Sequence, residues 1–359
     1  MAARIAVMAG GTGGHVFPAL AVAQQLRERG AEPFWMGTRA GLEARLVPAH
    51  DFEIEWLQVQ GVRGKGVKTL LRAPWQLGIA LREAAAVLRR RAPDVVLGMG
   101  GFVSGPGGLM AWRQGRALVI QEQNSIPGMT NQWLARVADR VFEGFPGSFP
   151  PARAAMTSGN PVRASISALA SPAERLAGRS GQVRLLVLGG SLGARALNLM
   201  VPQALAQLPQ TQRPEVRHQA GERTLALAQT AYREAGVTAD IQPFVEDMAA
   251  AYAWADVLIC RAGALTVAEV AAAGIPAIFV PFPYAVDDHQ VGNAEHLVKA
   301  GAAHMILESA LTPATLLARL EPLLSNTAQR LMMAQAARAQ ARPEAAAQIA
   351  TTCLELAER

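Results

Sequence analysis

The feature that most constrains this chain is a glycine-rich turn at residues 9–18 (AGGTGGHVFP), which follows a short apolar run at residues 5–8. The segment after the turn has helical periodicity and stops at Gly30, so strand, turn and helix predict a βα unit. Glycines let backbone N–H groups approach a ligand, and the helix start adds partial positive charge, so a phosphate or a polar sugar is the expected ligand. His15 is the one side chain of this turn that can exchange a proton near pH 7.

Two common nucleotide-binding motifs do not fit this turn. The third glycine of a dinucleotide fingerprint would fall on Val16. No Gly-Lys-Ser/Thr triplet follows, as it would in a P-loop. Glycines of this kind also serve to pack a helix closely against a sheet, so the turn by itself leaves a structural role open.

Composition limits the class of protein. A chain of 359 residues with 51% hydrophobic and 17% charged residues predicts two globular domains with large cores. Its two cysteines, Cys260 and Cys353, form no disulfide framework and are expected to be buried apolar side chains in a reducing compartment. No apolar run approaches the length of a membrane-spanning helix, so we expect a soluble protein without an anchor of its own.

The charge balance predicts an anionic partner. The formal net charge is +6 and the isoelectric point is near 10.0. A phosphorylated substrate, an acidic lipid surface or a nucleic acid would each satisfy this excess of positive charge. Aromatic residues make up only 5% of the chain and no nucleic-acid motif is present, so no nucleic-acid partner is expected.

The order of the segments predicts an α/β fold with two doubly wound, Rossmann-like domains. Strand and helix patterns alternate to about Phe142, and the segment 145–163, rich in proline and glycine, marks a linker. A strand, a glycine turn and a helix start again at residues 183–195. We expect domains at 1–160 and 161–340 facing a cleft, and a helix at 341–359 for which a return to the first domain is one option.

A basic helical segment at residues 70–91 carries an apolar face that includes Leu71, Trp75 and Ile79. Packing into the core is one explanation of this face. It would also suit the surface of an anionic membrane, because it is flanked by Lys65, Lys68, Arg72 and Arg82. The burial of Trp75 decides between the two explanations.

Six motifs, in this order along the chain, resemble those of the MurG family of bacterial glycosyltransferases. They lie at residues 10–18 (GGTGGHVFP), 98–108 (GMGGFVSGPGG), 122–124 (EQN), 159–163 (GNPVR), 189–191 (GGS) and 261–269 (RAGALTVAE). The resemblance implies a GT-B fold and transfer of N-acetylglucosamine from UDP-N-acetylglucosamine to the muramyl sugar of lipid I, which is muramyl-pentapeptide carried on undecaprenyl diphosphate. The product would be lipid II, a precursor of peptidoglycan.

The same resemblance implies a setting for the reaction. The protein would sit peripherally on the cytoplasmic face of the bacterial inner membrane, with the anionic membrane surface and other proteins of cell-wall synthesis as candidate partners. No cofactor is implied.

The resemblance also assigns substrate-binding residues. In the first domain it points to Thr12, Gly13, Gly14 and Asn124, the last of which reaches the sugar hydroxyls. In the second domain it places Arg163 and Ser191 near the diphosphate, Val245 at uracil through its backbone, and Gln290 at the donor sugar. The nucleoside would lie along Ala264, Leu265, Thr266, Val267, Ala268 and Glu269.

Glu269 is assigned to the ribose hydroxyls. A carboxylate suits this role because it accepts two hydrogen bonds. Thr266 and Glu269 also fit a capping box at the start of a helix, which is a purely structural alternative.

The leaving group defines what the site must supply. UDP departs as a diphosphate, so its oxygens need N–H donors or positive charge, and the acceptor hydroxyl needs a base. His15 is the candidate base, and Glu122 is the alternative if its pKa is raised. Direct displacement at the anomeric carbon would invert its configuration.

No metal is expected at this site. The chain has no Asp-x-Asp triplet of the kind that holds a metal against a nucleotide sugar. The neighbours Asp287, Asp288 and His289 follow one another at a strand exit, where adjacent side chains rarely converge on one ion.

Two departures from the family pattern and three competing classes complete the sequence evidence. Gln121 stands where many members have His, and Phe102 where Tyr is common, so neither side chain is assigned a role. A UDP-sugar epimerase could share the two-domain architecture. A nicotinamide-dependent oxidoreductase would need the glycine fingerprint that fails here, and a noncatalytic membrane scaffold would leave the two glycine turns unexplained.

Overall fold

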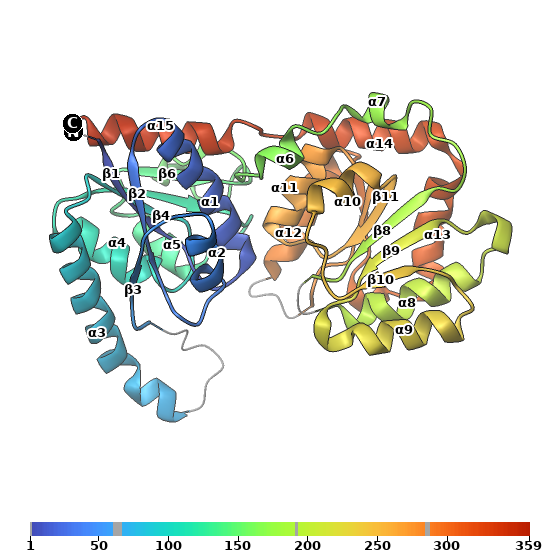
Figure 1. The fold of residues 1–359 in the computed structure, drawn as a ribbon, viewed down its shortest axis with the longest axis horizontal. Helices are drawn as coiled ribbons and strands as arrows, with labels where there is room; N and C mark the ends of the chain where they lie inside the picture. The colour runs from blue at the N-terminus through green and yellow to red at the C-terminus, as the bar shows by residue number, and fades with distance from the viewer. Residues whose placement is uncertain (1, 60–66, 191–192, 284–287) are drawn as a thin grey trace. The chain divides into compact units, whose positions relative to one another are not determined.

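The computed structural model describes residues 2–59, 67–190, 193–283 and 288–359. Three residues singled out above lie outside the described residues, namely Lys65, Ser191 and Asp287, as do the side chains of Lys68, Leu71 and Arg72. The chain divides into two compact units (Figure 1). The first runs to Arg163 and takes in Arg342–Arg359, and the second is Ala164–Ala341.

The first unit is built on a parallel sheet that has seven strands in the described chain, in the order β3-β2-β1-β4-β5-β6-β7. Its strands are β1 (Arg4–Met8), β2 (Glu32–Gly37), β3 (Ile54–Trp56), β4 (Val95–Gly98), β5 (Ala117–Glu122), β6 (Arg140–Glu143) and β7 (Met156–Thr157). Chain order runs outward in both directions from β1 and β4. This reversal makes the sheet doubly wound.

Helices cover both faces of this sheet because alternate residues of each strand point to opposite sides. Ile5 and Val7 of β1 join the core under α1 (Gly13–Glu28), α2 (Glu43–Ala49) and α15 (Ala345–Ala357). Ala6 and Met8 join the core under α3 (Val67–Arg91), α4 (Ser104–Arg113) and α5 (Met129–Leu134). A strand that is apolar on both faces is the pattern expected of a buried parallel sheet.

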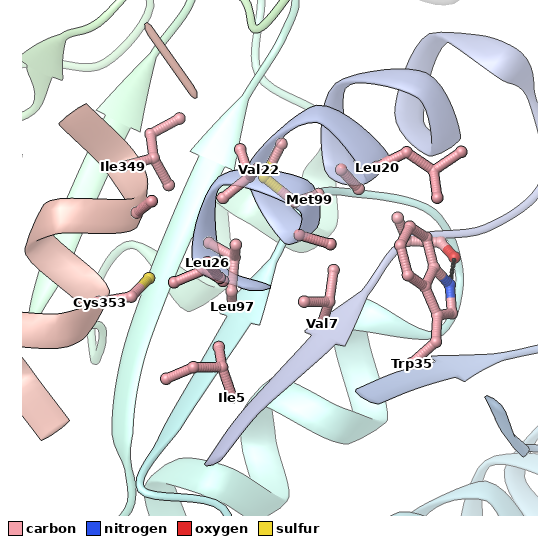
Figure 2. Close-up of a cluster of buried hydrophobic side chains, with 14 of the residues drawn as sticks. Ile5, Val7, Leu20, Val22, Leu26, Trp35, Leu97, Met99, Ile349 and Cys353 are labelled. Carbon is pink, nitrogen blue, oxygen red and sulfur yellow. Dashed lines mark hydrogen bonds between the residues drawn. The ribbon is translucent and has the colours of Figure 1, made fainter. Parts of the chain in front are cut away.

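The last helix, α15, belongs to the core of the first unit. Its Ile349 and Cys353 are fully buried beside Leu26 of α1 and Leu97 of β4 (Figure 2). The chain enters this helix past Gly159, which has a φ of +80°, and a Cβ there would lie 2.4 Å from the Cβ of Arg342. Only glycine fits this contact, both by conformation and by space.

The second unit has a parallel sheet in the order β10-β9-β8-β11-β12-β13. These strands are β8 (Arg184–Leu188), β9 (Glu215–Gln219), β10 (Asp240–Gln242), β11 (Val257–Cys260), β12 (Ala277–Phe279) and β13 (Ala303–Met305). The helices are α6 (Ala164–Ser167), α7 (Pro172–Leu176), α8 (Arg195–Ala206), α9 (Leu225–Glu234), α10 (Met248–Trp254), α11 (Ala264–Ala273), α12 (His289–Lys299), α13 (Pro313–Ser325) and α14 (Thr327–Ala339). Short 3-10 turns lie at Gln210–Gln212, Glu222–Thr224 and Glu308–Ala310 in this unit and at Pro151–Arg153 in the first.

The two parallel, doubly wound sheets confirm the predicted fold class. The prediction that the cysteines are buried and form no disulfide is also confirmed, since Cys260 and Cys353 are free and buried. Burial raises the pKa of the Cys353 thiol to about 12 and raises that of Cys260 as well. None of the described helices combines the length and the apolar character that crossing a membrane requires.

Candidate active site

The sheet of the first unit reverses its strand order between β1 and β4, and the helices that follow these two strands, α1 and α4, cover opposite faces of the sheet. In doubly wound folds, ligands bind at the carboxyl ends of the strands at this position. The two loops touch backbone to backbone, because a Cβ at Gly101 would lie 2.4 Å from the carbonyl oxygen of Gly10. In the second unit the same reversal lies between β8 and β11.

The turn after β1 presents a helix start to this position. Thr12 is the N-cap of α1 with an extended backbone and no side-chain cap bond, and Gly13 and Gly14 are the first two residues of the helix. The first N–H groups of a helix have no partner within the helix, so this end can donate to an anionic or polar ligand. The structure thus brings Thr12, Gly13, Gly14 and His15 together on one helical turn.

His15 is half-buried, and a neighbouring amide holds its imidazole ring. Its Nδ1 lies 2.7 Å from Oε1 of Gln123. The ring passes close under Gly100, where a Cβ would be 2.5 Å from Nδ1 and where φ is +95°. Gly100, after β4, therefore makes room for the imidazole. Gln123, the residue after β5, fixes the orientation of the ring.

Glu122 lies at the end of β5 with only 2% of its surface exposed. Its Oε1 accepts hydrogen bonds from the backbone N and Nδ2 of Asn124 at 2.9 and 3.1 Å. Its Oε2 accepts from the backbone N of Gly128 at 3.1 Å and from Nδ2 of Asn131 at 2.9 Å. Four donors thus surround this carboxylate, and it folds the loop between β5 and α5, including Asn124, around itself.

A second buried carboxylate, which sequence reasoning missed, holds the first glycine turn. Glu43, at the start of α2, is fully buried and accepts from the backbone N of Gly11 at 2.9 Å. It also accepts from the backbone N and the hydroxyl of Thr38 at 2.9 and 2.7 Å. A Cβ at Gly41 would lie 2.0 Å from this carboxylate. The glycines near Glu43 were therefore the one feature of the sequence that could have indicated a buried side chain here.

Arg163 is the last residue of the first unit. Its guanidinium lies over the ring of Phe17 on α1, 5.1 Å from the ring centroid. The structure therefore groups Arg163 with the first glycine turn, whereas the sequence placed it with the second domain.

In the second unit, α11 begins at the strand-order reversal, directly after β11. Gly263 is its N-cap with an extended backbone, and the helix makes no side-chain cap bond. The helix starts at Ala264, so the capping box suggested for Thr266 and Glu269 is wrong, since Thr266 is already inside the first turn. The predicted nucleoside residues form the first two turns of this helix, namely Ala264, Leu265, Thr266, Val267, Ala268 and Glu269.

Glu269 is 4% exposed, and its Oε2 accepts a hydrogen bond from the hydroxyl of Tyr252 at 3.0 Å. Tyr252 is fully buried on α10. The phenol gives Glu269 a fixed partner on one oxygen and orients the carboxylate.

The remaining predicted donor residues are held by neighbours in the second unit. The backbone N of Val245 donates to Oε1 of Gln219 at 3.1 Å, so a backbone contact from Val245 to a ligand would use its carbonyl group. Gln290 accepts at Oε1 from the backbone N of Phe282 at 2.9 Å. Asn293, which sequence reasoning missed, is fully buried on α12 and donates to the carbonyl of Ala262 at 3.2 Å, which fixes the turn before α11.

A pocket of about 460 Å³ lies beside Val245. It is lined by residues of β8, β9 and β10, the segment 243–247 and α10, among them Leu186, Arg217, Phe244 and Ala250. The volume is in the range of ligand pockets in proteins. As for metals, the described part of the chain contains no group of three His, Cys, Asp or Glu side chains that could hold an ion.

Trp75 is 72% exposed on α3, which contradicts packing of this residue into the core. Other large apolar side chains are exposed on α3, on α4, which packs against α3, and on α5, which packs against α4. We call this set the apolar patch: Trp75, Leu77, Leu109, Trp112, Met129 and Trp133. Arg82 on α3 and Arg113 on α4 are exposed, as is Arg136 just after α5, and the guanidinium of Arg136 lies 4.2 Å from the ring centroid of Trp133.

Comparisons with known proteins agree with this architecture. Sequence profiles of glycosyltransferase family 28 match at residues 5–143 for the N-terminal domain and 184–349 for the C-terminal domain. A relative from Nitrosococcus oceani is 57% identical over 357 residues, which cover 99% of both chains. Its name is UDP-N-acetylglucosamine--N-acetylmuramyl-(pentapeptide) pyrophosphoryl-undecaprenol N-acetylglucosamine transferase.

Solved structures give the same result. MurG from Acinetobacter baumannii superposes with a TM-score of 0.83 at 41% identity, covering 98% of this chain and 99% of its own. A UDP-N-acetylglucosamine 2-epimerase reaches a TM-score of 0.66 at 14% identity, covering 97% of this chain and 95% of its own, which is a likeness of fold alone.

Two doubly wound units, each with a glycine turn and a helix start at its strand-order reversal, are the architecture of the GT-B fold, and the family profiles make this chain a glycosyltransferase. The family profiles cover most of the chain, and relatives share more than half of its residues along its length. The chain belongs to glycosyltransferase family 28 and, within it, to the MurG group.

Proposed function

We propose that this protein transfers N-acetylglucosamine from UDP-N-acetylglucosamine to the muramyl sugar of lipid I, which makes lipid II for peptidoglycan synthesis. The observation that carries this conclusion is the 57% identity, along 99% of both chains, to a transferase named for that reaction. The geometry agrees, since a proton-accepting side chain lies at one strand-order reversal and a helix start at the other. The reaction class is an inverting hexosyl transfer.

His15 is the base in this proposal. It stands on the first turn of α1, beside the N–H groups of Gly13 and Gly14. The acceptor hydroxyl gives its proton to Nε2 of His15 as its oxygen bonds to the anomeric carbon, and the bond from that carbon to the UDP oxygen breaks. In the described structure Nε2 has no hydrogen-bond partner, whereas Nδ1 is held by Gln123.

Glu122 acts as a positioning residue in this proposal. A base must have an oxygen that can reach the substrate proton, and both oxygens of Glu122 already accept hydrogen bonds, three from its own loop and one from Asn131 on α5. Its role is to hold Asn124, which we assign to the sugar hydroxyls of the donor.

The second unit binds the nucleotide in this proposal. The N–H groups at the start of α11 can donate to the donor, and Glu269 accepts from the ribose hydroxyls. Val245 contacts uracil through its carbonyl group, and Gln290 contacts the sugar. Ser191 and, from the first unit, Arg163 are assigned to the diphosphate, where a guanidinium and hydroxyl or N–H donors stabilise the negative charge that develops as UDP leaves.

The apolar patch is proposed to dock on the anionic cytoplasmic face of the membrane, where lipid I would be available. Amphipathic tryptophans and nearby arginines are typical of proteins that lie on such a surface. Two exposed tryptophans, Trp75 and Trp133, are 72% and 63% accessible, which is unusual for large apolar side chains unless they are covered in use.

The test is a transfer assay with UDP-N-acetylglucosamine, labelled in the sugar, and a lipid I analogue. Label in the lipid product is the expected result, and the new linkage is β. Appearance of an epimerised sugar nucleotide without label in the lipid would reject the transferase and support an epimerase of the same fold. His15→Ala serves as the inactive reference, with an expected loss of about 10²–10⁴ in turnover.

A further inference from the structure

A chain of three buried amides connects the backbone at residue 160 to His15. Asn160 donates from Nδ2 to the carbonyl oxygen of Gln123 at 2.9 Å, and its Oδ1 accepts from Nε2 of Gln121 at 2.9 Å. Gln121 in turn accepts at Oε1 from Nε2 of Gln123. Gln123 completes the chain with its Oε1 facing Nδ1 of His15 at 2.7 Å.

The three amides are sealed from solvent. The exposed fractions are 0% for Gln121, 1% for Gln123 and 4% for Asn160. Gly144 makes room for Asn160, since a Cβ there would lie 2.3 Å from Oδ1. In such a site water cannot replace a misplaced donor or acceptor, so each amide must be oriented to satisfy its neighbours.

Backbone carbonyl groups fix the direction of this chain at both ends. A carbonyl oxygen only accepts, so Asn160 must present its NH₂ to the carbonyl of Gln123. At the other end, Gln123 donates from Nε2 to the carbonyl of Met99 at 2.8 Å. Turning any one amide around would set two acceptors or two donors against each other, so the oxygen of Gln123 faces His15.

We infer that Gln123 is a positioning residue that fixes the tautomer of His15. Because Oε1 of Gln123 only accepts, Nδ1 of His15 must carry the hydrogen, and the lone pair is left on Nε2. This rests on the proposed function, in which Nε2 takes the proton of the acceptor hydroxyl. Since a neutral amide sets the tautomer, the imidazole is oriented without a carboxylate that would favour its charged form.

This gives Gln121 a role that the sequence left unassigned. It does not reach a substrate, because it is fully buried. Instead it donates to Oδ1 of Asn160, in the segment 159–163, and accepts from Gln123, so the orientation of Asn160 determines that of Gln123. In each hydrogen bond between side chains from Asn160 to His15, the residue nearer to Asn160 is the acceptor.

The experiment measures the tautomer directly, by NMR of the whole protein labelled with ¹⁵N in its six histidines. The His15 signals are identified by their loss in His15→Gln. In the parent protein we expect Nδ1 in the protonated range and Nε2 in the unprotonated range. A parent protein with the hydrogen on Nε2 would overturn the inference.

Two substitutions at residue 123 separate hydrogen bonding from shape. Gln123→Met removes the acceptor, so the hydrogen should move to Nε2, and kcat should fall by about 10²–10⁴ while KM for UDP-N-acetylglucosamine stays within threefold. Gln123→Glu keeps an acceptor oxygen toward His15, so Nδ1 should keep its hydrogen, although the second carboxylate oxygen then faces the carbonyl oxygen of Met99 and Oε1 of Gln121 in place of the NH₂ group. Gln114→Met is the matched control, because Gln114 is a half-buried residue of the same unit that donates to the carbonyl of Ala85 and does not contact His15.

Three results would contradict the inference: an unchanged tautomer in Gln123→Met, an unchanged kcat despite a changed tautomer, or loss of the Nδ1–H tautomer in Gln123→Glu. Failure of the proposed function is recognised separately, because the tautomer is read without turnover. A parent protein that shows Nδ1–H but transfers no sugar would contradict the proposed function alone.

Discussion

Replacing Glu122 with Gln decides between the two candidate bases. The change keeps the size of the side chain but turns one carboxylate oxygen into an NH₂ group among four donors. The less costly orientation places the NH₂ group toward Gly128 and Asn131. Asn131 can then turn its Oδ1, which has no partner in the described structure, toward the new donor, but the N–H of Gly128 loses its acceptor.

The expected cost follows from these contacts. Loss of one charge-assisted hydrogen bond costs about 1.5–3 kcal/mol, and weakening the other three from charged to neutral adds about 0.5–1 kcal/mol each. The total is about 3–6 kcal/mol of unfolding free energy. For a unit of this size, 1 kcal/mol shifts Tm by about 2–4 °C, so Tm should fall by at least about 6 °C.

The assay combines thermal unfolding with steady-state transfer kinetics. Glu143→Gln is the matched control, because Glu143 ends the neighbouring strand β6 and is also buried. Its carboxylate accepts from the backbone N of Gly147, the backbone N of Phe149 and the hydroxyl of Thr157. If both carboxylates organise loops, the two variants should lose similar stability, and kcat of Glu122→Gln should fall by less than about 30-fold, short of the 10²–10⁴ expected for a base.

The opposite pattern would refute this reasoning. A Tm within 2 °C of the parent, together with a kcat lowered by more than about 10²-fold, would identify Glu122 as the base. His15 would then have to be assigned another role.

Three further predictions concern other parts of the molecule. Trp75→Ser should lower partitioning to phosphatidylglycerol vesicles by about tenfold in a cosedimentation assay, whereas Met332→Ser, at a largely exposed apolar site in the second unit, should not. Equal effects would exclude docking through the apolar patch. Glu269→Gln should raise KM for UDP-N-acetylglucosamine by about tenfold or more with kcat within threefold, and an unchanged KM would exclude a ribose contact. Burial lowers the pKa of His218 to about 3, so as pH falls below 6.5 the unfolded state binds a proton that the folded state does not. The free energy of unfolding should therefore be about 2 kcal/mol lower at pH 5 than above pH 6.5. Urea unfolding at both pH values checks this, and His218→Leu should lack that part of the pH dependence.

Local patterns predicted the fold because each strand and each turn is formed by residues that follow one another in the sequence. The apolar run at 5–8 and the glycines after it predict β1 and the start of α1, and the same pattern recurs at 183–195. The start of α11 was set too late, since the helix is capped by Gly263, a residue without a side chain to signal a cap. The start of α11 is defined by the extended backbone of Gly263, without a side-chain cap bond.

The site was less predictable because its key contacts join residues that are distant in sequence. Oε1 of Gln123 meets His15 across 108 positions, and Glu43 meets Gly11 across 32. The partners of Glu122 include Asn131 on a helix that follows its own loop. Residue types therefore identified which side chains could do chemistry, whereas the distinction between a base and a structural carboxylate needed the hydrogen bonds around each one.

The position of α15 has a consequence for the order in which the protein can fold. Ala346, Ile349, Ala350 and Cys353 complete a core whose other buried residues precede Arg163, so the ribosome makes all of Ala164–Ala341 between the two parts. The second unit is continuous in sequence and can fold as soon as it emerges. Until then the apolar side chains of α1, β4 and β5 that α15 covers stay exposed, so we expect the first unit to be the part of the nascent chain most in need of a chaperone and the part most sensitive to truncation of its last helix.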